Sequence, residues 1–197
     1  MKSNLFSPDN AAMLLIDHQV GTLNWVKSNT LEEIKRHTLA LARSAKETGM
    51  PLILTSSQED QVQGPLFDEL AAAVPEAFAN RIQRQGVVDA MKDPQFAMAV
   101  AAAGRRNLII AGITTDVCVV YPAITAIQQG YNVQVVVDGS GSPSTLADET
   151  ALRRMEAHGV TLTTTNQLIA ELAQDWSSPN GSKLMQVLFE EVLSKQG

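Results

Sequence analysis

The chain has 197 residues, of which 45% are hydrophobic and 18% charged, a composition typical of a globular protein with one well-formed core. Its formal net charge of −6 argues against nucleic acid or an anionic membrane as the main partner. The N-terminal segment lacks the apolar stretch of a signal peptide, no apolar run reaches the length of a membrane span, and the one cysteine cannot form an internal disulfide. We therefore expect a cytoplasmic protein.

Short apolar runs alternate with helical segments along the chain. In chain order, the expected elements are a strand at 11–17, a helix at 30–48, a strand at 52–56, helices at 67–73 and 94–103, a strand at 108–111, a helix at 118–129, a strand at 133–137, a helix at 144–158, a strand at 161–164, and helices at 166–173 and 183–193. This alternation predicts parallel β-α-β units in a single domain spanning 1–197.

Two features refine this outline. Thr30 followed by Glu33 is typical of a capping box, and Gly49 ends that helix. The stretch 177–182 is interpreted as a flexible turn before the last helix, which is amphipathic and is a candidate for packing on a neighbouring subunit.

In an open parallel sheet, ligands bind at the carboxyl ends of the strands. The first strand ends at Asp17, and the third is followed by a segment that leads to Cys118. We therefore expect both residues to face one crevice. A thiol near a helix start has a lowered pKa, the helix N–H groups can hold an oxyanion, and a carboxylate can act as a base. The alternative is structural: Asp17 caps a turn, and Cys118 packs its helix against the sheet.

Other motifs are absent from the sequence. It has no G-x-G-x-x-G phosphate loop, no closely spaced His or Cys pair for a metal, and no G-x-S-x-G nucleophile elbow. His37 and His158 fall within predicted helices and are interpreted as surface residues.

Several segments resemble the isochorismatase-like cysteine hydrolases. LLIDHQVG (14–21) is similar to the family's first strand, which ends in a catalytic aspartate, and LIIAGITTDVCVVYPAITAIQQGYNVQVVVD (108–138) is similar to its nucleophile segment. The DHQ start, GPLFDEL (64–70) and ELAQDW (171–176) further resemble the YcaC-like branch. The resemblance implies a three-layer α/β/α Rossmann-like sandwich with a mainly parallel central sheet, and it implies a homo-oligomer.

The resemblance also assigns roles to residues. Asp17 is the expected general base and Cys118 the expected nucleophile. A cis peptide is expected between Ile113 and Thr114, with the N–H groups of Thr114 and Cys118 as oxyanion donors. Gln19 and Val117 are candidates for lining the substrate pocket.

The family's third catalytic residue is usually a lysine, and here Arg84 stands in register with it within ANRIQRQGVVDAM (79–91). Arginine holds its proton firmly, so Arg84 could hold Asp17 and polarise the site but not shuttle protons. Arg81 is the alternative if the register differs by three, and either arginine could instead be a solvated surface residue.

A second departure concerns metal. Nicotinamidases of this family carry Asp-x-His after the second strand, where this chain has Ser56, Ser57 and Gln58. We therefore expect no catalytic zinc and no other cofactor, and nicotinamide is disfavoured as the substrate.

The leading hypothesis is a hydrolase that acts on a small amide, or on a related C–N or acyl substrate, through a thioester on Cys118. One alternative is a non-catalytic oligomeric protein of the same fold, which the arginine in place of lysine favours. Another is a thiol redox sensor, which the lack of a second, resolving cysteine disfavours. Expected partners are a small-molecule substrate and further copies of the chain, with neither nucleic acid nor membrane.

Overall fold

A single parallel sheet organises the chain, in a computed structural model that describes residues 5–195. The six strands lie in the order β3-β2-β1-β4-β5-β6, and every pairing is parallel. Their bounds are β1 Ala11–Ile16, β2 Leu52–Ser57, β3 Ile82–Arg84, β4 Asn107–Gly112, β5 Asn132–Val136 and β6 Thr161–Thr163. Five of these strands match the predicted ones. β3 was not predicted, because three residues without an apolar run carry too little periodic signal.

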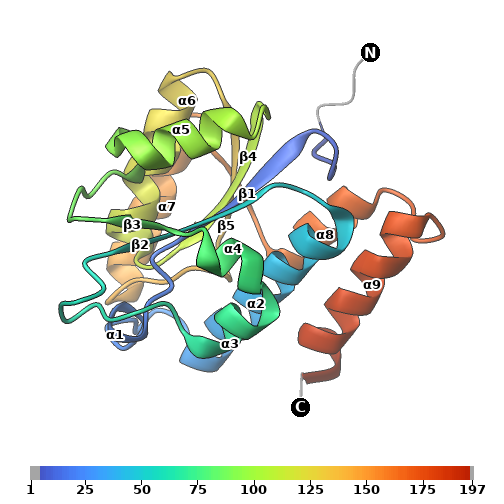
Figure 1. Cartoon of the computed structure of the whole chain (residues 1–197), viewed down its shortest axis with the longest axis horizontal. Coiled ribbons are helices and arrows are strands. Elements are labelled where there is room, and N and C mark those ends of the chain that lie inside the picture. The colour runs from blue at the N-terminus through green and yellow to red at the C-terminus, as the bar shows by residue number, and fades with distance from the viewer. Residues whose placement is uncertain (1–4, 196–197) are drawn as a thin grey trace.

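Helices cover both faces of the sheet (Figure 1). One face carries α2 (Leu31–Thr48), α3 (Asp68–Ala73), α4 (Pro75–Ala79), α8 (Thr165–Ala173) and α9 (Pro179–Glu191), and the other carries α5 (Pro94–Ala102), α6 (Val120–Gln128) and α7 (Thr145–Ala157). Short turns complete the chain: α1 (Val20–Leu23), a π-helical turn (Thr115–Val119) and 3₁₀ turns at Ala90–Lys92 and Leu193–Lys195. This is the predicted three-layer α/β/α sandwich with a parallel central sheet.

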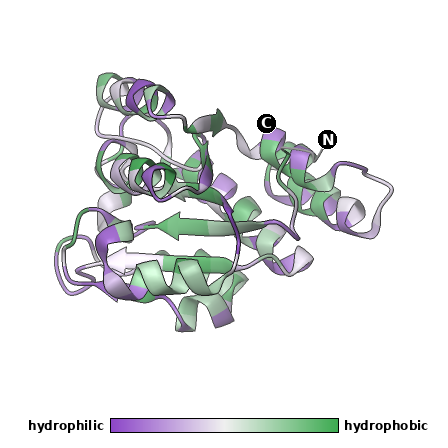
Figure 2. Ribbon diagram, turned by 90° about the horizontal axis from the view of Figure 1, so that it is seen from above, coloured by the Kyte–Doolittle hydropathy of each residue, from purple (hydrophilic) through white to green (hydrophobic). Residues whose placement is uncertain are grey.

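Strand β1 shows why the sheet needs two helical layers. All six of its residues are buried, and they alternate between the two hydrophobic clusters. Met13 and Leu15 pack with α2 and α8, whereas Leu14 and Ile16 pack with α5, α6 and α7. The central strands are accordingly green in Figure 2, while the helices mix green and purple because each buries only one face.

The start and end of α2 follow the predicted signals. The hydroxyl of Thr30 accepts a hydrogen bond from the N–H of Glu33 at 3.2 Å and donates one to the Glu33 carboxylate at 2.8 Å. Gly49 then ends the helix with a φ of 72°, a conformation that glycine adopts without steric cost.

Helix α9 begins earlier than predicted. Pro179 opens it, and Ser178 caps it by accepting from the N–H of Gly181 at 2.9 Å, so much of the predicted flexible turn is helical. A Cβ at Gly181 would lie 1.9 Å from the carbonyl oxygen of Asp175, so the close turn requires glycine. The helix packs on α2 and α8, where Arg43 of α2 bonds Glu190 and Glu191.

The interpretation of His37 as a surface residue is wrong. Its side chain is 14% exposed, and its Nδ1 lies 3.6 Å from the Asp138 carboxylate, which also accepts from Thr165 at the start of α8. His158 is exposed, as predicted. No helix within residues 5–195 combines the length and apolar character that a membrane crossing requires.

Candidate active site

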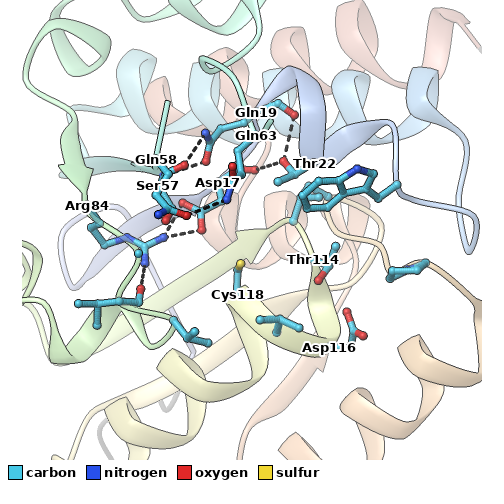
Figure 3. Close-up of a pocket in the computed structure, with 17 residues that line it drawn as sticks. Asp17, Gln19, Thr22, Ser57, Gln58, Gln63, Arg84, Thr114, Asp116 and Cys118 are labelled. Atoms are coloured by element: carbon cyan, nitrogen blue, oxygen red, sulfur yellow. Dashed lines mark hydrogen bonds and ion pairs between the residues drawn. The ribbon is translucent and has the colours of Figure 1, made fainter. Parts of the chain in front are cut away.

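A cavity of about 310 Å³ lies at the carboxyl ends of the central strands (Figure 3). It contains every site residue predicted above: Asp17, Gln19, Arg84, Ile113, Thr114, Val117 and Cys118. Each lies in or just after a strand or in the turn before α6, so the topology alone brings these distant segments together.

Arg84 occupies the inner wall of the cavity. It is the last residue of β3, and its side chain is only 1% exposed. The guanidinium donates to both carboxylate oxygens of Asp17, at 2.6 Å to Oδ1, and Nε donates to the Thr55 hydroxyl at 3.0 Å. A further N–H donates to the carbonyl of Val87. Four bonds from one planar group fix its orientation completely.

The competing arginine lies elsewhere. Arg81 donates to both oxygens of Glu59, at 2.7 and 2.8 Å, stacks on Phe78, and is absent from the cavity wall. The register that aligns Arg84 with the family's lysine position is therefore the one that reaches the site. Because Arg84 is buried and paired, its interpretation as a solvated surface arginine is wrong.

Asp17 directly follows β1 in a left-handed conformation, with a φ of 56°. Its N–H donates to the carbonyl of Thr55 at 2.9 Å, and its carbonyl accepts from the Thr22 hydroxyl at 2.9 Å. These bonds hold an uncommon backbone conformation and direct the carboxyl into the cavity (Figure 3). Burial raises the pKa of Asp17 above that of an ordinary aspartate, while the Arg84 charge acts in the opposite direction.

Cys118 lies in the π-helical turn before α6, not in the first turn of an α-helix as predicted. Burial raises the pKa of its thiol, and the charge of Asp17 and a hydrogen bond to that carboxyl raise it further. The expectation that a helix terminus lowers this pKa is wrong, because desolvation and the neighbouring carboxylate outweigh the helix effect. The raised pKa favours the protonated thiol over the thiolate at Cys118.

The peptide between Ile113 and Thr114 is cis, as the family resemblance implies. The carbonyl of Thr114 accepts from the N–H groups of Cys118, at 2.8 Å, and Val119, at 3.2 Å. The N–H of Cys118 is therefore occupied in the resting structure, contrary to its expected role as a free oxyanion donor. No described residue accepts from the N–H of Thr114.

Gln19 and Val117 line the cavity, but they differ in character. Gln19 is fully buried, and its amide bonds the backbone of Ser57 in both directions and the carbonyl of Gly64. It therefore fixes the loop after β2, which forms part of the wall. Val117 is 38% exposed at the rim.

The sequence did not single out several other residues of the wall: Thr22, Trp25, Gln63, Gly86, Val87, Val88, Asp116 and Pro143. Apart from Asp116, which lies two positions before Cys118, and Thr22, which lies in α1, they come from irregular segments whose path the local sequence pattern does not determine.

The positions that replace the metal motif make other bonds. Ser56 donates to the Glu59 carboxylate at 2.6 Å, and the N–H of Ser57 donates to Gln19 at 2.8 Å. Among the described residues, no three His, Cys, Asp or Glu side chains are grouped so as to hold a metal ion.

A thiol, a carboxyl and a buried arginine therefore meet at the carboxyl edge of a parallel sheet. The family model of the isochorismatase domain matches residues 11–167. The chain belongs to the isochorismatase family and is an isochorismatase-like hydrolase.

Individual relatives place it further within the family. The probable hydrolase YcaC of Escherichia coli is 40% identical over 168 residues, which cover 85% of this chain and 80% of that protein. The structure of YcaC from Pseudomonas aeruginosa with hexane-2,5-diol and covalent acrylamide matches with a TM-score of 0.91 at 36% identity, covering 98% and 95% of the two chains. The Escherichia coli YcaC structure, described as an octameric hydrolase of unknown specificity, also gives 0.91 at 36% identity, covering 98% and 94%.

Proposed function

We propose that this chain hydrolyses a small amide, or a related C–N or acyl substrate, through a thioester on Cys118. The observation that carries the proposal is the convergence of the Cys118 thiol and the Asp17 carboxyl in one cavity, where Arg84 holds that carboxyl and the carboxylate raises the pKa of the thiol. A nucleophile and a base in one cavity, with the base held by an orienting group, constitute the usual arrangement for covalent catalysis.

In the first half-reaction, Sγ of Cys118 attacks the substrate carbonyl carbon while the thiol proton passes to Asp17. The tetrahedral intermediate then expels the amine, which takes that proton as the C–N bond breaks. The raised pKa of Asp17 suits this exchange, because it makes the carboxylate a stronger base towards the thiol proton. Arg84 stays protonated throughout and keeps both carboxylate oxygens in place.

In the second half-reaction, a water molecule attacks the thioester carbonyl and gives its proton to Asp17. The C–S bond breaks, the acid product leaves, and the proton returns to sulfur. The N–H of Thr114 is the candidate oxyanion donor in both halves, since Thr114 lines the cavity and no described residue accepts from that N–H.

The raised pKa of the Cys118 thiol also bears on the two alternatives to a hydrolase, which are a redox sensor and a non-catalytic protein. A redox sensor needs an accessible thiolate, whereas Cys118 is half-buried and beside a carboxyl that disfavours its ionisation. A site that has lost turnover has no need to keep Arg84, Asp17 and Cys118 in contact.

We further propose that the chain forms a homo-oligomer, as the octameric YcaC of Escherichia coli does. The inner face of α9 is buried within its own chain, but Met185 is 37% exposed and Phe189 58% exposed on its outer side. In Figure 1, α9 is the outermost layer beyond α2 and α8, so these side chains are available to a second copy.

Acid-quench mass spectrometry tests the mechanism directly. The protein is mixed with a panel of small amides, hydroxamates and esters, quenched within milliseconds and digested. We expect an acyl mass on the Cys118 peptide that decays at the rate of product release. Acrylamide provides a separate test of reactivity: since the chain has one cysteine, the adduct should be absent from Cys118→Ser. Hydrolysis that survives Cys118→Ser within a fewfold would overturn the proposal.

A further inference from the structure

The wall of the cavity carries one uncompensated negative charge. Of the described lining residues, Asp17, Arg84 and Asp116 have formal charges, and the first two form an ion pair. Asp116 has no ion-pair partner among the described residues. A ligand that enters the cavity therefore meets an excess of one negative charge.

Asp116 is held in place but not satisfied. Its backbone N–H donates to the Ser142 hydroxyl at 3.3 Å, and that hydroxyl donates to Asp148 at 2.7 Å. Its side-chain Oδ1 is buried and finds no hydrogen-bond partner within residues 5–195. A buried carboxylate oxygen without a donor is costly and is usually paired. In Figure 3 the carboxylate lies beside Thr114, on the side of the cavity away from Arg84.

Two other residues of the cavity wall suit the same ligand chemistry. Oε1 of Gln63 is a second buried acceptor that has no hydrogen-bond partner among the described residues. Trp25 also lines the cavity with 45% of its surface exposed, and an indole face attracts a cation. The cavity wall thus combines the unpartnered acceptors of Asp116 and Gln63 with the aromatic ring of Trp25.

We propose that Asp116 is a specificity-determining residue that selects small amides carrying a positively charged nitrogen. This inference rests on the proposed function, since Cys118 is taken as the point of acyl transfer. Asp116 lies two positions before Cys118 in the same turn, so the charged nitrogen is separated from the scissile carbonyl by a short spacer. The cavity of about 310 Å³ is at the small end for ligand sites, which favours a compact substrate.

The charge preference is testable without any substrate. Methanethiosulfonates form a mixed disulfide with a thiol and release methanesulfinate, and the single cysteine makes the reaction specific to Cys118. We compare the aminoethyl reagent, which is cationic, with the sulfonatoethyl reagent, which is anionic, each normalised to the neutral methyl reagent. The cationic reagent should react faster, and Asp116→Asn should lower the cation-to-anion ratio by about threefold to tenfold.

The matched control is Asp9→Asn. Asp9 is exposed and precedes β1, at the opposite edge of the sheet, so the same loss of charge should change the ratio by less than about 1.5-fold. An Asp116→Asn ratio equal to that of the wild type, or to that of Asp9→Asn, would overturn the proposal.

A second measurement compares ligands. β-Alaninamide and butyramide have the same size, but only the first carries an ammonium group. We expect β-alaninamide to protect Cys118 from the neutral methyl reagent at lower concentration, and Asp116→Asn to remove this advantage. Protection depends on binding, so this comparison can be made even if neither amide is hydrolysed. Failure of the proposed hydrolysis can therefore be distinguished from failure of charge selection. Equal protection by the two amides in the wild type would contradict the inference.

Discussion

Replacing Arg84 by methionine tests whether the arginine compensates the buried charge of Asp17. Both side chains are at most 2% exposed, so the variant leaves a carboxylate in a dry site without its partner. Removing one member of a buried pair costs about 3–5 kcal/mol, to which the lost bonds with Thr55 and Val87 contribute. We expect the free energy of unfolding at pH 8 to fall by that amount.

The pH dependence identifies the cause. Burial already raises the pKa of Asp17 and Arg84 opposes that rise, so the variant raises this pKa further. When a carboxyl has a higher pKa in the folded protein than in the unfolded chain, the protein loses stability as the pH rises from the unfolded pKa towards the folded one. The deficit should therefore grow with pH, by up to about 1.4 kcal/mol per unit, where Asp17 is ionised in the wild type but protonated in the variant.

Urea unfolding at pH 5 and pH 8, at one fixed protein concentration, measures these differences. Arg81→Met is the matched control: its pair with Glu59 is about 17–18% exposed and lies outside the cavity, so its loss should cost about 1 kcal/mol or less. Adding Asp17→Asn to Arg84→Met should recover roughly 2 kcal/mol at pH 8. An identical deficit at both pH values, with no recovery in the double variant, would show that Arg84 contributes packing rather than charge compensation.

Three further outcomes are expected. Iodoacetamide should modify Cys118 at pH 7 more slowly than it modifies a cysteine in an unstructured peptide. Asp17→Asn should speed the reaction, because it removes a charge that raises the thiol pKa. Faster alkylation of the wild type than of Asp17→Asn would contradict this. Cys118→Ser should lower turnover by several orders of magnitude and Asp17→Asn by about 10²- to 10⁴-fold, with the double variant no worse than Cys118→Ser; additive losses measured in steady-state assays would argue against a shared step. Phe189→Glu should reduce the mass measured by light scattering while the far-UV spectrum is unchanged, and an unaltered mass would exclude the outer side of α9 as the interface.

The parallel sheet could be predicted because its strongest strands are buried on both faces. Ala11–Ile16 is apolar throughout, and so is the 108–111 part of β4. The strand Ile82–Arg84 could not be predicted in the same way, because only three residues pair with β2. Its place in the sheet depends on contacts with a segment 27 positions earlier in the chain, as in the pairing of Thr55 with Ile82.

The site residues likewise divide into those that the sequence could place and those that it could not. Asp17 and Cys118 follow long, recognisable strands, so their convergence follows from the rule for strand ends. Arg84 could be placed only by resemblance, since β3 has no signal of its own. The thiol pKa was predicted in the wrong direction, because a helix terminus is visible in a sequence whereas burial and the approach of Asp17 depend on tertiary structure.

In the proposed mechanism, these electrostatics favour a particular order of events at Cys118. Burial and a neighbouring carboxylate raise the pKa of the thiol, so the proposed nucleophile forms as its proton moves to Asp17. On this proposal, the same carboxyl suppresses reactivity of the free thiol and enables attack on a bound substrate. Asp17→Asn should separate the two effects, since it accelerates alkylation and slows hydrolysis. If both rates rose in Asp17→Asn, Asp17 would act on Cys118 through its charge alone and not as a proton acceptor.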